Sequence, residues 1–375
     1  MKKIIFITIG VIAVIAVGIF LCLNNAEQKQ GIINVGIILP LSGDGALYGK
    51  SLQNGIDLAL ENANATDSSV RLIYEDSKLD PKLAVNAFQK LSTINGCKIV
   101  LGGFSSSDVL SMAPIAQRNK VVLISPTASS PAITNAGDYI FRTTPSDNFD
   151  GEIMAKFAYN ELNLRNIVVI FSNNDYGQGI SKVFSEKFTE LGGKITAERS
   201  FESGANDFKS QLTALKESSP DGLYVIAAAE IGAILKQKAE LNFNEVKTFT
   251  VGLAENPMVI EIAGNAANST YYSYPAYKID SDDDIVQTFV KKYKEKYGTD
   301  PDVLAAYGYD LMNIALVALK NGNIADNIKK TLFSLKNFNG ITGETSFDSN
   351  GDVSKTAGIK VIENGEFKWF INRFN

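Results

Sequence analysis

The chain has 375 residues, of which 45% are hydrophobic and 21% charged, a composition typical of a folded protein with more than one domain. Its 36 basic and 41 acidic residues give a net charge of −5, and no basic tract offers nucleic acid a binding surface. The lack of histidine and the presence of only two cysteines exclude histidine-based triads, imidazole zinc sites and thiolate metal clusters. An enzyme is therefore less favoured, although chemistry by carboxylates, by lysine or by a Ser–Lys pair stays open. We expect a protein that is not an enzyme and that uses neither a metal nor a cofactor, in line with the resemblance given below.

Residues 1–30 are expected to form a signal anchor followed by a polar linker. Two lysines precede the uncharged run Ile4–Leu23, which as a helix would rise about 30 Å, the thickness of a bilayer core. Cys22 raises the alternative of a lipid anchor, although Leu21 stands where a small residue normally precedes the modified cysteine. Either anchor places the body outside the cytoplasm, where Cys97 has no partner within the body and is expected to be a buried, inert thiol.

From Ile33 the chain alternates short β-rich runs with helical patterns. In its first part we expect strands at Ile33–Leu39, Val70–Glu75, Lys98–Leu101 and Val121–Ile124. Helices are expected between them at Leu47–Asn62, Pro81–Ile94 and Asp108–Gln117. This alternation is typical of a parallel sheet that is covered by helices on both faces.

A second series of the same kind starts after residue 145. Its strands are expected at Asn166–Phe171, Lys194–Phe201, Gly222–Ile226 and Lys247–Val251, and its helices at Asp150–Glu161, Gly179–Leu191, Asp207–Lys216 and Ile231–Leu241. Two further helices, one ending near Gly298 and one at Val303–Leu319, precede a β-rich tail with a hairpin signal at Asn364-Gly365. The expected fold is α/β with two doubly wound parallel-sheet lobes, whose strand ends face a shared cleft.

Two glycine-rich loops at strand ends are candidate binding loops. Gly43–Gly49 resembles a dinucleotide fingerprint, but Tyr48 stands where the third glycine belongs, so a polar ligand loop is the better interpretation. Gly102–Asp108 resembles a nucleophile elbow without the following glycine and without a histidine to activate the serine. Its serines either cap the next helix, through Ser106 or Ser107, or hold a carboxylate together with the similar loop Ser125–Ser129.

Two other motifs have simpler explanations. Asp348–Asp352 resembles the start of a calcium loop, but Ile359 occupies the position of the bidentate glutamate, so a turn is expected. The tyrosine-rich run Tyr271–Tyr277 suits either a cleft lining or strand packing.

These pieces, in this order, resemble the type I periplasmic binding proteins that serve branched-chain amino acid ABC importers. The similarity runs from about Ile33 to Phe374 and rests on segments at Gly36–Gly43, Tyr74–Ser77, Gly102–Ser107, Ile124–Pro131, Phe141–Asp147, Asp175–Gly179, Ala305–Asp310 and Gly340–Gly343. The resemblance implies two lobes joined by three hinge crossings, near Pro145, Pro275 and Asp348. The first lobe would comprise residues 31–146 and 276–348, and the second residues 147–275 and 349–375.

The resemblance also implies roles for individual residues. Ser105 would bind the ligand carboxylate, and Thr127 and Ser129 would hold both the carboxylate and the amino group. Tyr48 and Tyr176 would close over the ligand from opposite lobes, and Glu255 would pair with its ammonium group. Such an acid is needed because a buried ammonium group without a counter-charge is costly.

Three departures from the family pattern concern the ligand side chain and the early disulfide. Ala227-Ala228-Ala229 replaces an expected tyrosine, Leu304 replaces an aromatic contact, and the family's early disulfide is absent. Glu230 would supply a polar contact or cap the next helix.

We therefore expect a monomeric extracytoplasmic solute-binding protein, anchored to the membrane, that captures an amino acid, branched-chain or related, and passes it to an ABC permease. The alternatives are a ligand-sensing receptor module for an amide or small carboxylate and, ranked below it, a hydrolase that uses acids such as Glu75, Asp76 and Glu255.

Overall fold

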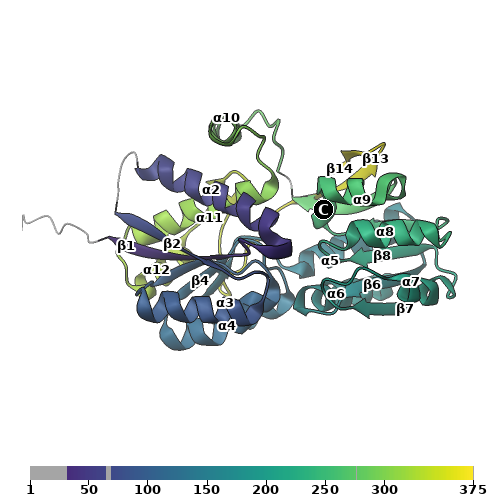
Figure 1. Ribbon diagram of the computed structural model, residues 1–375, viewed down its shortest axis with the longest axis horizontal. Helices are drawn as coiled ribbons and strands as arrows, with labels where there is room; N and C mark the ends of the chain where they lie inside the picture. Colours follow the sequence, from purple (N-terminus) through teal and green to yellow (C-terminus); the bar gives the residue numbers. More distant parts are fainter. Residues whose placement is uncertain (1–31, 65–68, 276, 375) are drawn as a thin grey trace, which may run out of the picture.

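The computed structural model describes residues 32–64, 69–275 and 277–374. They form two lobes side by side along the long axis of the molecule, each built around its own sheet (Figure 1). The expected fold class is confirmed. Within the described ranges no helix is long and apolar enough to cross a membrane, and the predicted anchor lies outside them.

The first lobe holds a five-stranded parallel sheet in the order β2-β1-β3-β4-β5. Its strands are β1 (Ile33–Leu39), β2 (Val70–Asp76), β3 (Ile99–Gly102), β4 (Val122–Ser125) and β5 (Ile140–Arg142). Its helices are α2 (Ala46–Asn64), α3 (Pro81–Gln89), α4 (Ser106–Asn119), α10 (Asp284–Tyr297), α11 (Val303–Leu319) and α12 (Ala325–Ser334).

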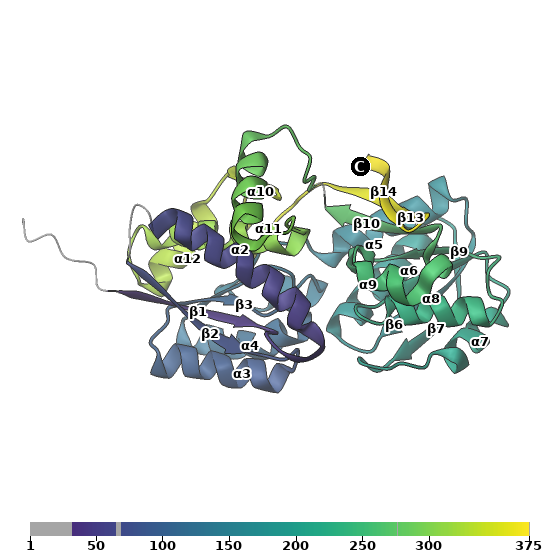
Figure 2. The same ribbon diagram turned by 45° about the horizontal axis from the view of Figure 1, so that its top comes forward.

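Alternation along β1 shows why helices cover both faces of this sheet. Val35, Ile37 and Leu39 are fully buried in the core formed with α2, α11 and α12, whereas Ile38 points into the core formed with α3 and α4. Figure 2 shows these two helical layers on opposite sides of the sheet. Consecutive residues of one strand therefore stabilise two different helix layers.

Helices α2 and α11 pack with their backbones in contact. A Cβ atom on Gly55 would lie 1.9 Å from the Ala305 carbonyl oxygen, and one on Gly308 would lie 2.2 Å from that of Leu52. Only glycine permits so close an approach at both positions. This contact joins a helix from the start of the chain to one that follows the whole parallel part of the second lobe.

The second lobe holds a seven-stranded sheet in the order β14-β13-β10-β9-β8-β6-β7. Its strands are β6 (Asn166–Ser172), β7 (Lys194–Phe201), β8 (Gly222–Ile226), β9 (Lys247–Thr250), β10 (Thr270–Pro275), β13 (Ala357–Glu363) and β14 (Glu366–Phe374). Its helices are α5 (Asp147–Lys156), α6 (Asp175–Glu190), α7 (Lys209–Lys216), α8 (Ile231–Glu240) and α9 (Pro257–Ala263). The last two strands are antiparallel and join through Asn364 and Gly365, both with positive φ, which confirms the predicted hairpin.

The chain passes between the lobes between β5 and α5, after β10, and before β13. The sequence placed the third passage near Asp348, but Phe347 and Val353 both lie in the core of the first lobe. The passage therefore follows Val353 and ends at Ala357, the first residue of β13. The short hairpin of β11 (Phe338–Gly340) and β12 (Gly343–Thr345) precedes it.

Candidate functional site

The loop after β3 presents the start of α4 at the carboxyl edge of the first sheet. Gly102, with φ of 128°, lies so close to β1 that a Cβ atom would be 2.0 Å from the Ile38 carbonyl oxygen. Ser105 is the N-cap: its Oγ accepts from the Asp108 backbone N–H at 3.0 Å. The cap is thus Ser105 and not Ser106 or Ser107, since those two residues already belong to the helix. A half-buried serine at a helix N-terminus is a favourable place for an anion.

The loop after β4 is bonded directly to the loop after β3. Thr127 Oγ1 donates to the Phe104 carbonyl oxygen at 2.7 Å, and the Ser130 N–H donates to Ser106 Oγ at 3.1 Å. Ser105, Thr127 and Ser129 therefore lie on one continuous wall, as expected for two parallel neighbouring strands. Ser129 is 9% exposed and Thr127 is half-buried.

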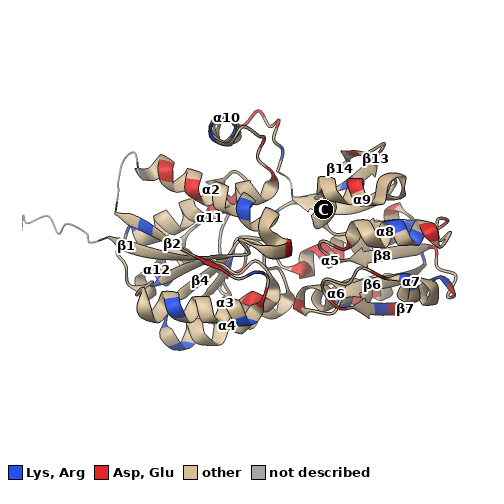
Figure 3. Cartoon of the chain, in the orientation of Figure 1, with Lys and Arg blue, Asp and Glu red and all other residues tan. Residues whose placement is uncertain are grey.

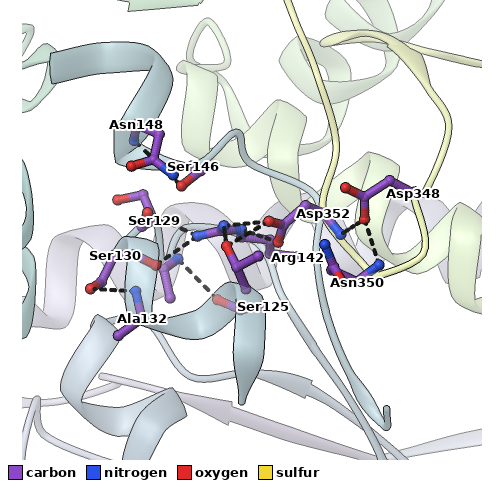
Figure 4. Close-up of polar contacts among 12 residues, drawn as sticks. Ser125, Ser129, Ser130, Ala132, Arg142, Ser146, Asn148, Asp348, Asn350 and Asp352 are labelled. Atoms are coloured by element: carbon purple, nitrogen blue, oxygen red, sulfur yellow. Dashed lines mark hydrogen bonds and ion pairs between the residues drawn. The ribbon is translucent and has the colours of Figure 1, made fainter. Parts of the chain in front are cut away.

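Arg142, whose importance the sequence did not reveal, holds this wall in place. Its guanidinium is fully buried and donates to both carboxylate oxygens of Asp352, to the carbonyl oxygens of Ser129 and Ser130, and to Thr134 Oγ1, at 2.7–2.9 Å. Figure 4 shows Arg142 between the serine loop and the loop that carries Asp352. All five of its N–H donors thus bond to groups of the protein, and none is left for a ligand.

The loop Asp348–Asp352 forms a turn. One oxygen of Asp348 accepts from the backbone N–H groups of Asn350 and Asp352, as Figure 4 shows, and both oxygens of Asp352 accept from Arg142. Elsewhere, too, no group of three or more metal-binding side chains gathers among the described residues. Cys97 is buried, and burial raises the pKa of its thiol to about 11, so the thiol is unreactive.

Two side-chain contacts join the lobes near the serine wall. Tyr48 stacks on Phe104 with ring centroids 5.5 Å apart, and its hydroxyl accepts from Asn256 Nδ2 of the second lobe at 3.2 Å. Ser107 Oγ donates to Asp175 at 2.5 Å, which brings the N-termini of α4 and α6 together. We call the region between these contacts the interlobe site.

Tyr176 enters the interlobe site from the first turn of α6. The residue is half-buried, and burial, together with the nearby Asp147 and Asp150, raises the pKa of its hydroxyl well above the usual value. The hydroxyl is therefore neutral and available as a hydrogen-bond donor. Tyr48 is also kept neutral, mainly by burial.

The predicted ammonium partner, Glu255, already has partners within the second lobe. It forms an ion pair with Lys360, whose side chain is 8% exposed, and accepts from the Tyr272 hydroxyl at 2.7 Å. The Lys360 ammonium lies over the rings of Tyr274 and Trp369, at 4.7 and 5.2 Å from their centroids.

The residues predicted to contact the ligand side chain are more deeply buried than expected. Ala227 is fully buried in the core of the second lobe, and Leu304 is 9% exposed at the start of α11. Glu230 accepts from the backbone N–H groups of Gly204 and Ala228 and provides no side-chain cap for α8. The half-buried Ala228 is more accessible than Ala227.

Two acids at the start of α5 were not recognised as site residues. Asp147 is 2% exposed, and its backbone N–H donates to the Ser129 carbonyl oxygen at 2.8 Å. Asp150, one turn later, lies next to Ser273 of β10. In Figure 3 the acidic first turn of α5 lies where the second lobe faces the first, while elsewhere charges of both signs are interspersed.

Comparisons with known proteins agree with this architecture. The sequence profile of a family described as periplasmic binding protein matches residues 32–364. The Leu/Ile/Val-binding protein homolog 1 of Brucella suis is 26% identical over 360 residues, covering 94% of this chain and 94% of that protein. A leucine-binding protein of Thermotoga maritima has a TM-score of 0.86 at 30% identity, covering 92% of this chain and 99% of the other. A branched-chain amino acid transporter substrate-binding protein of Streptococcus pneumoniae, solved with isoleucine, has a TM-score of 0.82 at 28% identity, covering 90% and 97%.

Proposed function

Since the chain belongs to the periplasmic binding protein family, the non-enzymatic, extracytoplasmic solute-binding proteins of ABC transporters, we propose that it captures an amino acid, branched-chain or related, between its two lobes and delivers it to an ABC permease. The observation that carries this ligand class is the continuous hydroxyl-rich wall formed by the loops after β3 and β4 at the N-terminus of α4. Relatives described as binding leucine, isoleucine or valine support it.

In this proposal the ligand carboxylate binds Ser105, Thr127 and Ser129. The Ser105 hydroxyl already accepts from the α4 backbone, so its own proton is free to point at an oxygen of the carboxylate. Tyr176 donates a hydrogen bond to the ligand from the opposite lobe, and Tyr48 closes over the ligand from the first lobe. Capture is hinge closure, in which each lobe contributes part of the ligand shell and no covalent step occurs.

The ligand side chain would lie against the region of Ala227 and Leu304. These residues are smaller than the aromatic residues expected there, which favours an enlarged apolar pocket. The chain would act as a monomer held at the outer face of the membrane by residues 1–30.

A ligand panel tests the proposal. The full chain, purified in mild detergent, is screened by thermal shift against the twenty standard amino acids, amides and small carboxylates including benzoate. A solute present at 100 times its Kd adds about 2.7 kcal/mol of stability, a clearly visible shift. Shifts confined to a few amino acids would support the proposal, whereas shifts with amides or carboxylates alone would assign the alternative ligand class.

A variant links the ligand to the wall. Ser105→Ala should weaken the binding of an amino acid hit by about 1–3 kcal/mol, because a charged group loses a hydrogen bond. Calorimetric titration measures the difference, and an unchanged Kd would remove Ser105 from the site.

A further inference from the structure

The acid expected to receive the ligand ammonium group is already neutralised. Glu255 and Lys360 form an ion pair, and the Lys360 ammonium occupies the aromatic faces of Tyr274 and Trp369. The net charge of this pair is zero. A ligand ammonium group placed at Glu255 would have to compete with the Lys360 ammonium, which three side chains hold in position.

Asp147 and Asp150 present the opposite situation. The charge of Arg142 acts on Asp147, but the hydrogen bonds of that guanidinium go to Asp352, Thr134 and two carbonyl groups. The other groups that face the two acids are neutral: Ser129, Ser273, and three tyrosines of α6, β8 and α11, namely Tyr176, Tyr224 and Tyr307. When ionised, the two carboxylates therefore have no cation of the protein that is free to pair with them.

The surroundings of Tyr307 do not supply this cation. Lys355 lies 5.9 Å from the Tyr307 ring centroid, but its Nζ donates to Thr342 Oγ1 and it faces Asp310. It therefore serves a different carboxylate.

Among the two acids and the groups that face them, three deeply buried polar atoms have no hydrogen-bond partner within the described residues. They are Asp147 Oδ2, in a residue 2% exposed, Ser273 Oγ, in a residue also 2% exposed, and the hydroxyl of Tyr224, a residue with no exposed surface. Tyr224 lies close enough to both acids to feel their charge. Buried carboxylate and hydroxyl oxygens without partners are costly, and an ammonium group is a ligand that can donate to several of them at once.

Asp147 and Asp150 also lie where a bound amino acid would place its ammonium group. Asp147 adjoins Ser129, Tyr176 comes from the second lobe, and Tyr307, which senses the charge of Asp150, comes from the first lobe. The two acids therefore lie at the lobe boundary beside the wall proposed to hold the carboxylate.

On the basis of the proposed capture of an amino acid, we propose that the ligand ammonium group binds between Asp147 and Asp150 of α5 and not at Glu255. The protein thereby selects for solutes that carry a positive charge next to their carboxylate. Lys360 takes the place that the ammonium group has at Glu255 in the expected arrangement.

Binding at this pair is coupled to a proton. Burial raises the pKa of Asp150 to about 6 and that of Asp147 well above its usual range. A bound ammonium group favours the ionised carboxylates, so binding below about pH 6 releases a proton to the solvent. Affinity for amino acids should therefore fall as the pH is lowered from 7 to 5.

The test compares Asp150→Asn with its matched control Glu255→Gln in the full chain. Both variants and the parent are titrated calorimetrically at pH 7 and pH 5 with the amino acid giving the largest thermal shift and with its 2-hydroxy acid. We expect Asp150→Asn to lose at least tenfold in affinity for the amino acid at pH 7 and to show a smaller change in affinity between pH 7 and pH 5 than the parent. Glu255→Gln should change the affinity less. The 2-hydroxy acid should bind more weakly than the amino acid to the parent and equally well to parent and Asp150→Asn. Circular dichroism confirms that each variant is folded.

Each other outcome is decisive. Loss of amino acid binding in Glu255→Gln with unchanged binding in Asp150→Asn would overturn the assignment and leave amino acid capture intact. Binding of 2-hydroxy acids or benzoate alone would overturn it and leave the protein a solute receptor for carboxylates. If no amino acid and no carboxylate binds the parent, the proposed function fails and the ammonium site with it.

Discussion

Replacing Arg142 by methionine should destabilise the first lobe by about 4 kcal/mol. The substitution leaves the Asp352 carboxylate and the carbonyl oxygens of Ser129 and Ser130 without their buried donor. Removing one partner of a buried ion pair costs about 3–5 kcal/mol. That is a large part of the roughly 5–15 kcal/mol by which folded domains are stable.

Two spectroscopic probes distinguish the unfolding of the two lobes in a urea titration. Trp369, the only tryptophan, lies on β14, so its fluorescence reports on the second lobe, whereas far-ultraviolet circular dichroism reports on both. With a denaturant slope of about 2–3 kcal/mol/M, a loss of 4 kcal/mol lowers a urea midpoint by roughly 1.3–2 M. We expect that shift in the circular dichroism transition and a smaller one in the fluorescence.

A double variant tests the cause. In Arg142→Met with Asp352→Leu, no buried charge is left unpaired, so part of the stability, at least about 1 kcal/mol, should return. An unchanged midpoint in Arg142→Met, or a double variant that is less stable than the single one, would refute the reasoning.

Three further predictions follow from the same geometry. Ser105→Ala removes the cap of α4 and should lower stability by about 1 kcal/mol, measured by urea unfolding; an unchanged midpoint would contradict the cap. Asp150 binds its proton more tightly in the folded state, with a pKa of about 6, so the stability of the native state should fall as the pH rises from 4 to 6. Asp150→Asn should make stability less dependent on pH in this range and add about 1–3 kcal/mol at pH 7. Thermal unfolding measured across this pH range tests both effects. Tyr48→Phe combined with Ser107→Ala removes the two side-chain hydrogen bonds described between the lobes, each of about 0.5–1.5 kcal/mol, and should increase the radius of gyration in small-angle scattering without added solute. An unchanged radius would show that the contacts do not hold the lobes together.

Most elements could be predicted because their signals are local. β1, β7, β8 and α11 begin and end where periodicity and flanking turns placed them. β5 was missed because it has only three residues, and the seven-residue α9 was missed because so short a helix has little periodicity. α12 was also missed, although Asn321-Gly322-Asn323 before it is a turn signal.

The candidate site was less accessible to sequence reasoning because its key contacts are distant along the chain. Glu255 and Lys360 are 105 residues apart, and Arg142 and Asp352 are 210 apart, so no spacing pattern predicts either pair. Asp147 and Asp150 read as ordinary acids of a helix start, and only the fold buries them against β10 and α11. The two hydroxyl-rich loops were predictable together, because neighbouring parallel strands end at the same edge.

The glycine contact between α2 and α11 determines the order in which the chain can finish folding. During synthesis the apolar face of α2 must wait for residues 303–319, which emerge after β6 to β9 of the other lobe. The second sheet in turn lacks β13 and β14 until the last residues appear. Such interleaving raises the mean sequence separation of contacting residues, which slows folding. The first lobe is thus complete only once Val353 has been made, and the second lobe only once β13 and β14 have been made. A nascent chain therefore exposes apolar surface on both lobes until late in its synthesis.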